Sequence, residues 1–189
     1  MRIVLAGILG AIAMFAWTSI AHMATPLGNM GLSQIPDEAP VIAAMQRSIG
    51  DHSGLYFFPW IDPKDPKMME KYAKIMPTSP SGLLLYHPPS GDTGMTKQLV
   101  YEFVKELIEA LIAAFLLGWA GIASYLGRAG FVTLVGVSAS ISTNASYWIW
   151  YKFPCDYTLA YIAITLIGYF AAGLVMAAVV KAKPVPTPQ

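Results

Sequence analysis

Residues 96–125, TKQLVYEFVKELIEALIAAFLLGWAGIASY, decide the fold. On a helix of about 100° per residue, Gln98, Glu102, Lys105, Glu106 and Glu109 share one narrow stripe, and apolar residues cover the rest. No further charge follows Glu109 in this stretch. At 1.5 Å per residue the helix would be about 45 Å long, against about 30 Å for the hydrocarbon core of a bilayer. The stretch therefore predicts one long helix that crosses a membrane and projects beyond one surface.

The composition is that of a membrane protein. Of the 189 residues, 56% are hydrophobic and 12% charged, whereas soluble domains carry about 25% charged residues. The net charge of +1 and the lack of a basic patch give no reason to expect nucleic acid as a partner. The single cysteine, Cys155, cannot form an intrachain disulfide.

Four hydrophobic segments each approach the roughly 20 residues that span a bilayer. We therefore expect an all-α membrane protein with four transmembrane helices and a small α+β extramembrane cap between the first and second helices. The expected organisation is a first transmembrane helix at 1–24, the cap at 25–95, transmembrane helices two to four at 96–183, and a proline-rich tail at 184–189, with the apolar segments at 3–23, 107–125, 131–151 and 157–180.

The charge distribution predicts the topology. With both termini in the cytoplasm, the inner segments hold Arg2, Arg128, Lys181 and Lys183 without an acidic residue, as the positive-inside tendency favours. Every Asp and Glu then lies on the outer side. This arrangement predicts a multi-pass protein of a bacterial inner membrane with a periplasmic cap. Alternatively, the first segment is a secretory signal cleaved after Ala21, although we expect a retained helix.

The cap should contain two helices and two strands. One helix is expected from the acidic turn at Asp37 to about Ser48, and another from Asp65, a good N-cap, to the residue before Pro77. Residues 53–59 (SGLYFFP) and 81–88 (SGLLLYHP) repeat one pattern and predict short strands. Parallel and antiparallel pairing are both open at this point.

One polar constellation stands out in the expected bundle. In the expected topology its members all fall near the outer interface, where three carboxylates on one helix need compensation. Such a cluster suggests a metal or proton site. The alternative, which we favour, is structural packing through ion pairs, with Lys105 between two of the carboxylates. The constellation consists of His22, Glu102, Lys105, Glu106, Glu109 and Asn144.

Cofactor and catalytic motifs are absent from the sequence. No diiron, zinc-protease, phosphate-loop or nucleophile-elbow pattern occurs, so no catalytic residue, metal or cofactor is predicted. A histidine in a span can ligate a haem or chlorophyll-type group, which makes His22 the one weak candidate. Its place near a helix C-terminus explains it without a cofactor.

Three stretches carry a resemblance. AMFAWTSIAHMATPLG at the amino terminus, SGLYFFP and SGLLLYHPPS resemble segments of small, uncharacterised multi-pass membrane proteins of bacteria. The resemblance implies a bacterial inner-membrane protein and carries no activity with it.

The expected function is non-enzymatic. Small-residue stripes, aromatic belts and an apolar cap favour an accessory or scaffolding subunit of a larger membrane complex of respiratory or photosynthetic type, whose partners are the lipid bilayer and other membrane subunits. The alternative is a small transporter or ion-binding protein that uses the Glu and His cluster. A third, weaker alternative is a haem- or chlorophyll-type pigment protein.

Overall fold

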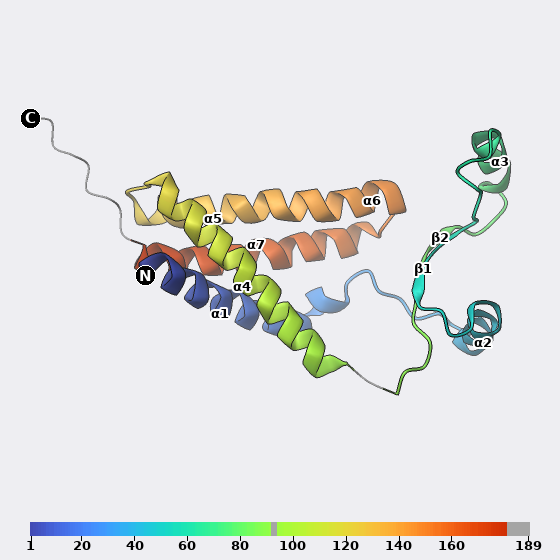
Figure 1. The fold of residues 1–189 in the computed structure, drawn as a ribbon, viewed down its shortest axis with the longest axis horizontal. Helices are drawn as coiled ribbons and strands as arrows, with labels where there is room; N and C mark the ends of the chain where they lie inside the picture. Colours follow the sequence, from blue (N-terminus) through green and yellow to red (C-terminus); the bar gives the residue numbers. More distant parts are fainter. Residues whose placement is uncertain (92–93, 181–189) are drawn as a thin grey trace, which may run out of the picture. The chain divides into compact units, whose positions relative to one another are not determined.

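The computed structural model describes residues 1–91 and 94–180 (Figure 1). The chain divides into two compact units. The helical unit comprises Met1–Leu32 together with the chain from Gly94 onward, and the cap unit comprises the residues between them, from Ser33. The predicted tail at 184–189, with Lys181 and Lys183, lies outside the described residues.

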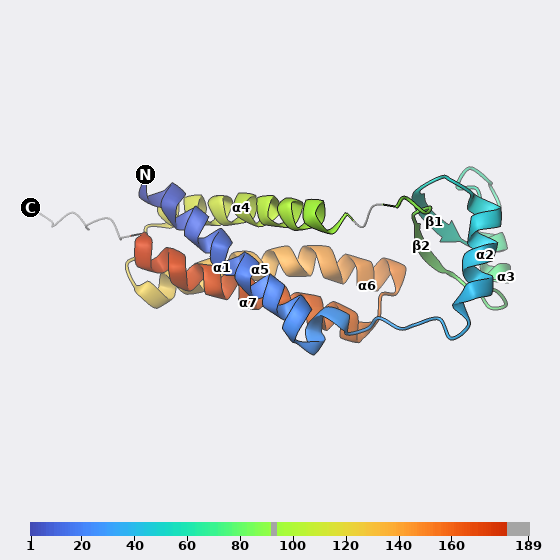
Figure 2. The same cartoon turned by 90° about the horizontal axis from the view of Figure 1, so that it is seen from below.

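The helical unit is built from long helices that pack in a row. α1 (Arg2–Ala24) lies between α4 (Met95–Ala120) and α7 (Cys155–Val179), and α7 in turn packs on α5 (Tyr125–Ser140) (Figures 1 and 2). α5 continues through a π-helical turn, Ile141–Ala145, into α6 (Ser146–Tyr151). A short 3₁₀ turn, Pro26–Asn29, follows α1 and contacts both α1 and α7.

Three of these helices are long and apolar enough to cross a membrane: α1, the continuous Tyr125–Tyr151 helix, and α7. The prediction of a helical membrane protein is confirmed to that extent. α4 is not among the three, because every stretch of it that is long enough to span contains Lys105, Glu106 and Glu109. The fourth span therefore stays a prediction.

Small residues make the close contacts between the helices. Gly7 and Gly10 of α1 face Leu111 and Met176, and Gly136 of α5 lies against the ring of Tyr169. The backbones of α5 and α7 lie close together at Gly173, where an added Cβ would lie 2.8 Å from the carbonyl oxygen of Ala129. Such close approach is how helices associate in lipid, where burying apolar area gives little driving force. The buried alanines that complete this core include Ala6, Ala11, Ala110, Ala113, Ala114 and Ala172.

The long helix predicted for residues 96–125 is shorter than expected. It ends at Ala120, because Gly121 adopts a left-handed conformation (φ 64°) that terminates a helix. The next helix begins at Tyr125 and not at residue 131. Ser124 caps it by accepting a hydrogen bond from the backbone N–H of Gly127 at 3.0 Å. The sequence stays apolar across this break between α4 and α5, and only Gly121 and Ser124 indicate it.

The cap unit holds two helices and a two-stranded sheet. α2 (Glu38–Ile49) matches the predicted first helix. α3 (Met68–Ile75) begins three residues after Asp65, whose carboxylate accepts from the backbone N–H of Lys67 at 2.8 Å in the preceding turn. The strands β1 (Gly54–Phe58) and β2 (Gly82–Tyr86) pair antiparallel, with Gly54 opposite Tyr86 and Phe58 opposite Gly82, which settles the direction left open by the sequence.

Candidate functional site

A small polar pocket lies between α1, α4 and α7. It encloses about 120 Å³, and five of the six constellation residues line it: His22 from α1 and Glu102, Lys105, Glu106 and Glu109 from α4. We call it the carboxylate pocket. The rest of its lining comes from Met14, Thr18, Tyr161, Ile164, Thr165, Gly168 and Tyr169.

Glu106 is the most unusual member of the pocket. Its side chain is 1% exposed. The hydroxyl of Thr18 donates a hydrogen bond to Oε1 at 2.7 Å, whereas Oε2 is buried with no hydrogen-bond partner among the described residues. Buried polar atoms are almost always paired, so an unpartnered carboxylate oxygen calls for an explanation.

Lys105 does not supply the missing partner. Its ammonium group donates to Oε1 of Glu102 at 2.8 Å, in an i,i+3 pair whose two side chains are both about half exposed. It lies within electrostatic reach of Glu106 and Glu109 as well. The packing interpretation of the constellation therefore accounts for Glu102 and Lys105 but leaves one oxygen of Glu106 unexplained.

His22 lies at the outer part of the pocket and is exposed. Its Nδ1 is 3.0 Å from the carbonyl oxygen of Thr18, and its ring meets Tyr161 edge-on at 5.8 Å between centroids. Because a carbonyl only accepts, Nδ1 carries the proton in this contact, and in the neutral ring Nε2 is then an acceptor. Within the described residues no group of three or more His, Cys, Asp or Glu side chains could hold a metal ion.

Asn144 is not part of the pocket. It lies in the π turn, where its amide donates to the carbonyl oxygen of Ser140 at 3.0 Å. The side chain that we expected to join the cluster thus bonds to the backbone of Ser140, the last residue of α5.

Four hydroxyl residues of the pocket were not predicted from the sequence. Thr18 lies one helical turn before His22, and Tyr161 and Tyr169 lie eight residues apart on α7 with Thr165 between them. Tyr169 interacts with Glu109 through its hydroxyl. Spacings of four residues place side chains on one helix face, and that regular row of hydroxyls was the available signal.

A second, more open pocket adjoins the first. It measures about 360 Å³ and shares Thr18, His22, Glu102 and Tyr161 with the carboxylate pocket. We call it the antechamber, because these shared residues make the two hollows neighbours. Its remaining lining consists of Phe15, Ser19, Met23, Met95, Gln98 and Leu99.

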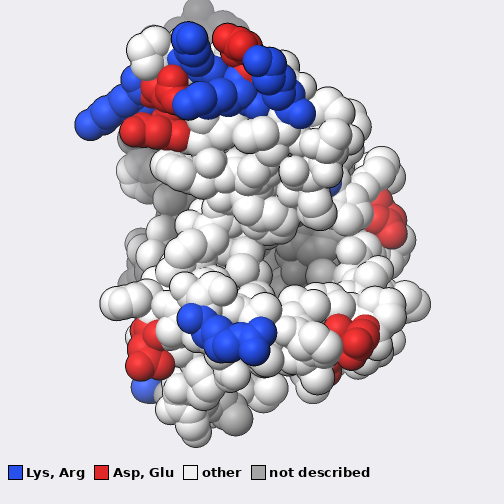
Figure 3. Space-filling model, turned by 90° about the vertical axis from the view of Figure 1, so that its right-hand side faces the viewer, with Lys and Arg blue, Asp and Glu red and all other residues white. Residues whose placement is uncertain are grey.

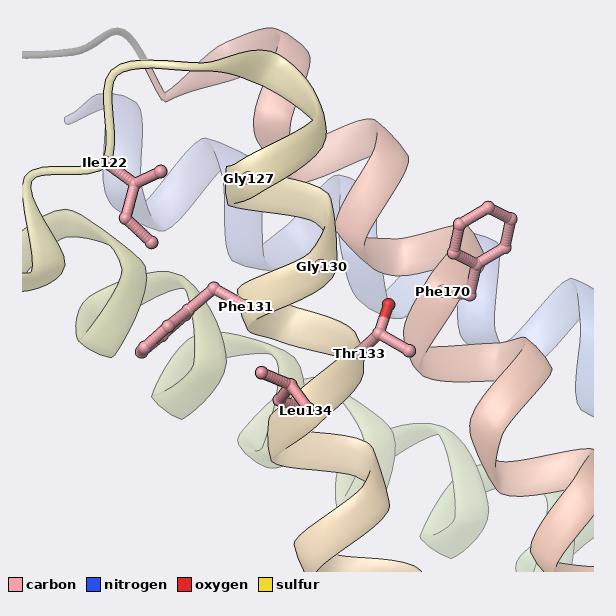
Figure 4. A pocket seen from close by; sticks show the side chains of 7 residues that line it. All are labelled: Ile122, Gly127, Gly130, Phe131, Thr133, Leu134 and Phe170. Atoms are coloured by element: carbon pink, nitrogen blue, oxygen red, sulfur yellow. The ribbon is translucent and has the colours of Figure 1, made fainter.

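Two other hollows offer little polar chemistry. The groove beside α5 in Figure 4 is lined by apolar side chains and glycines, and the hydroxyl of its Thr133 already donates to the carbonyl oxygen of Ala129 at 2.9 Å. A pocket in the cap unit is aromatic and aliphatic. It is lined by Phe57, Pro59, Trp60, Ile61, Pro63, Met68, Met69 and Tyr72.

Charged side chains in the cap form no continuous basic surface. Lys71 pairs with Asp65, and Lys74 donates to Glu70 at 2.6 Å. Figure 3 accordingly shows blue and red side chains interleaved on the face it displays. This mixture is unlike the clustered positive charge of a nucleic-acid-binding surface.

No protein-family model, curated protein or solved structure matches the chain. The function must therefore be inferred from the chemistry of the carboxylate pocket.

Proposed function

We propose that this chain is a membrane protein of the transporter class that binds a proton at Glu106. The observation that carries the proposal is the buried Oε2 atom of Glu106, which has no partner among the described residues and belongs to a residue that lines the carboxylate pocket. An ionised carboxylate is very costly to bury without a compensating partner. Carboxylates in such positions commonly mark proton or ion pathways.

A proton suits this pocket better than a metal ion. Lys105 already contributes a positive charge to the pocket, and no three-ligand group is present in the described ranges. The groups that face Glu106 are Thr18 and His22 from α1, Glu102, Lys105 and Glu109 from its own helix, and Tyr161 and Tyr169 from α7. All except Lys105 and the carboxylates are hydroxyls or an imidazole, which can pass a proton as well as hold one.

The antechamber supplies a route to Glu106. It is open to the surroundings and borders the carboxylate pocket at Thr18, His22, Glu102 and Tyr161. A proton that enters there reaches Glu106 past the imidazole of His22 and the hydroxyl of Thr18, which already touches the carboxyl group.

The proposal includes a fourth membrane-spanning helix. The part of α4 from Leu107 to Ala120 is uncharged except for Glu109 and covers about 20 Å at 1.5 Å per residue, so a span of about 30 Å also takes in the two turns before it, with Glu102, Lys105 and Glu106. Glu106 and its neighbours would then lie near one interface of the bilayer. Four spans would leave both termini on one side and the cap on the other, and the sequence favours the cytoplasm and the periplasm of a bacterium for these sides.

The test is proton flux through the full chain in liposomes. Vesicles that hold a pH-sensitive dye receive a potassium diffusion potential, and internal pH is followed with wild-type protein, Glu106→Gln and Glu70→Gln. We expect flux with wild type and with Glu70→Gln, an exposed residue paired with Lys74 in the cap, and none with Glu106→Gln. If vesicles with the wild-type protein show no more proton flux than vesicles without protein, the transport proposal is wrong.

A second candidate is the accessory subunit of a larger complex, and one observation favours it. α4 packs mainly on α1 and little on α5, so much of its surface is unpartnered. Gentle detergent extraction followed by mass determination tests this role, since stoichiometric co-purification with larger subunits would support it and a lone monomer or homo-oligomer would remove it. The exposed apolar side chains of α4 include Leu99, Val100, Val104, Ile108, Ile112, Phe115 and Trp119.

A further inference from the structure

We infer that the antechamber binds a small organic cation with an aromatic or alkyl body, such as an aryl ammonium compound. The inference rests on the proposed proton site, because it gives that site a substrate. The unpartnered, buried oxygen of Glu106 next to the antechamber is the independent sign that this part of the molecule is built for a ligand.

The size of the antechamber fits this class of ligand. Its volume of about 360 Å³ falls in the range of small-molecule pockets, about 300–1,000 Å³. The carboxylate pocket, at about 120 Å³, has room for far less. An organic ligand therefore occupies the antechamber, while the proton occupies the inner pocket.

The lining selects a positive charge. Glu102 lines both pockets. Its Oε1 atom accepts a hydrogen bond from Lys105, which lines the carboxylate pocket. Glu109 lies directly beyond Glu102 and adds to the negative potential, and Glu106 does so whenever it has released its proton. A cation placed at the boundary between the two pockets would be attracted by these carboxylates, whereas an anion would be repelled.

The remaining walls accept an apolar body. Phe15 and Tyr161 contribute aromatic rings, whose faces attract ammonium groups. Met23 and Met95 are flexible, polarizable side chains that adapt to ligands of different shape. A carboxylate, two rings and two methionines together describe a site for an amphipathic cation.

The test compares two molecules of the same shape and different charge. Benzyltrimethylammonium is titrated into the full chain in an uncharged detergent and followed by calorimetry, and its neutral carbon analogue neopentylbenzene is titrated alongside. We expect the cation to bind about tenfold more tightly or better, the fold-change that charge and cation–π contacts of this size give. Equal binding of the two compounds, or no binding of the cation, would overturn the inference without recourse to any variant.

Variants then locate the site. Glu102→Gln and Phe15→Leu should each weaken cation binding about tenfold, while Glu70→Gln in the cap should leave it unchanged. Unchanged binding in both antechamber variants would place the ligand elsewhere and overturn the inference. Protonation of Glu106 is measured separately by infrared spectroscopy. If the cation does not bind but the infrared signal of Glu106 is present, the inference about the cation is wrong and the proposed proton site is retained.

Discussion

The helical unit and the cap unit bury their side chains in different ways. In the helical unit, alanines and glycines from α1, α4, α5 and α7 bring the helix backbones close together, and large side chains such as Leu117 and Met176 fill what remains. In the described part of the cap, Tyr86 is the only fully buried residue. The helical unit is stabilised by many close contacts between small residues. The described part of the cap unit has one buried residue, Tyr86, which we call its anchor.

This difference indicates which of the two units can accommodate a buried carboxyl group. A costly buried carboxyl group is tolerated only in a unit with a redundant core, because folding must offset its desolvation. Glu106 lies in such a unit, between three well-packed helices. The described part of the cap has no comparable core, so a buried charge of this kind would be harder to accommodate there.

Removal of the anchor in the cap should have the largest effect. Tyr86 is 6% exposed and donates a hydrogen bond to the carbonyl oxygen of Gly50 at 3.0 Å. Tyr86→Ala should cost about 3–4 kcal/mol, as deletion of a buried aromatic ring does, and unfold the cap. Hydrogen exchange should show rapid exchange in residues 33–91 and unchanged protection in the helices. Tyr86→Phe, which loses only the hydrogen bond, should cost about 1 kcal/mol. Normal protection of the cap in Tyr86→Ala would refute the single-anchor description.

The second prediction concerns the helical unit and its close contact between α5 and α7 at Gly173. Gly173→Leu should destabilise it by about 3 kcal/mol, the upper end for overpacking, because a backbone carbonyl faces the new side chain and cannot move away. Unfolding in mixed detergent micelles measures the change. Gly130→Ala is the matched control on α5, since nothing lies within 4 Å of the added Cβ. A helix usually gains about 0.5–1 kcal/mol from such a change. Equal effects of the two variants would show that the helices are not in close backbone contact.

Thr18 tests how the helical unit accommodates Glu106. Thr18→Val removes the hydrogen bond to Oε1 and should destabilise the unit by about 1 kcal/mol, the usual net contribution of one hydrogen bond. In the double variant Thr18→Val, Glu106→Leu the hydroxyl and the carboxyl are both gone, so the loss should be smaller than in the single variant. Unfolding in mixed micelles provides the measurement. Strictly additive effects would mean that the two side chains do not interact.

Much of the fold could be predicted because it rests on periodicity. The apolar runs marked the three helices that are long and apolar enough to cross a membrane, and the shared Ser-Gly pattern marked both strands. The end of α4 was missed, because hydrophobicity continues past Gly121 while the backbone conformation changes there. Strand direction is a tertiary property, and it became known only from the paired register.

The candidate site was predicted in part for a similar reason. Charged residues in an apolar stretch are conspicuous, which is why Glu102, Lys105, Glu106 and Glu109 were recognised. Thr18 is uncharged and ordinary in a membrane helix, and only the packing of α1 on α4 reveals its contact with Glu106. Asn144 was expected in the cluster, but its amide donates to the backbone carbonyl of Ser140 at the end of α5.

The smallest expected effect is a pH dependence confined to the cap. A hydrogen bond from Lys71, followed by one from the backbone of Lys67, lowers the pKa of Asp65 below its usual value of 3.8. Because the folded pKa is depressed, the stabilisation is fully present above the usual value and is lost as the pH falls through the lower folded value. The fluorine NMR signal of labelled Trp60 should report this acid-induced loosening, and Asp65→Asn should reduce it. An identical acid response in Asp65→Asn would contradict the assignment.

The most direct test of the central claim is an infrared titration of Glu106 in the full chain. Difference spectra recorded as the pH is changed should contain the C=O stretch of a protonated carboxyl group in a dry environment. We expect that band in the wild type and in Glu70→Gln, and its absence in Glu106→Gln. Identical bands in wild type and Glu106→Gln would show that Glu106 does not take up a proton and would contradict the proposed function.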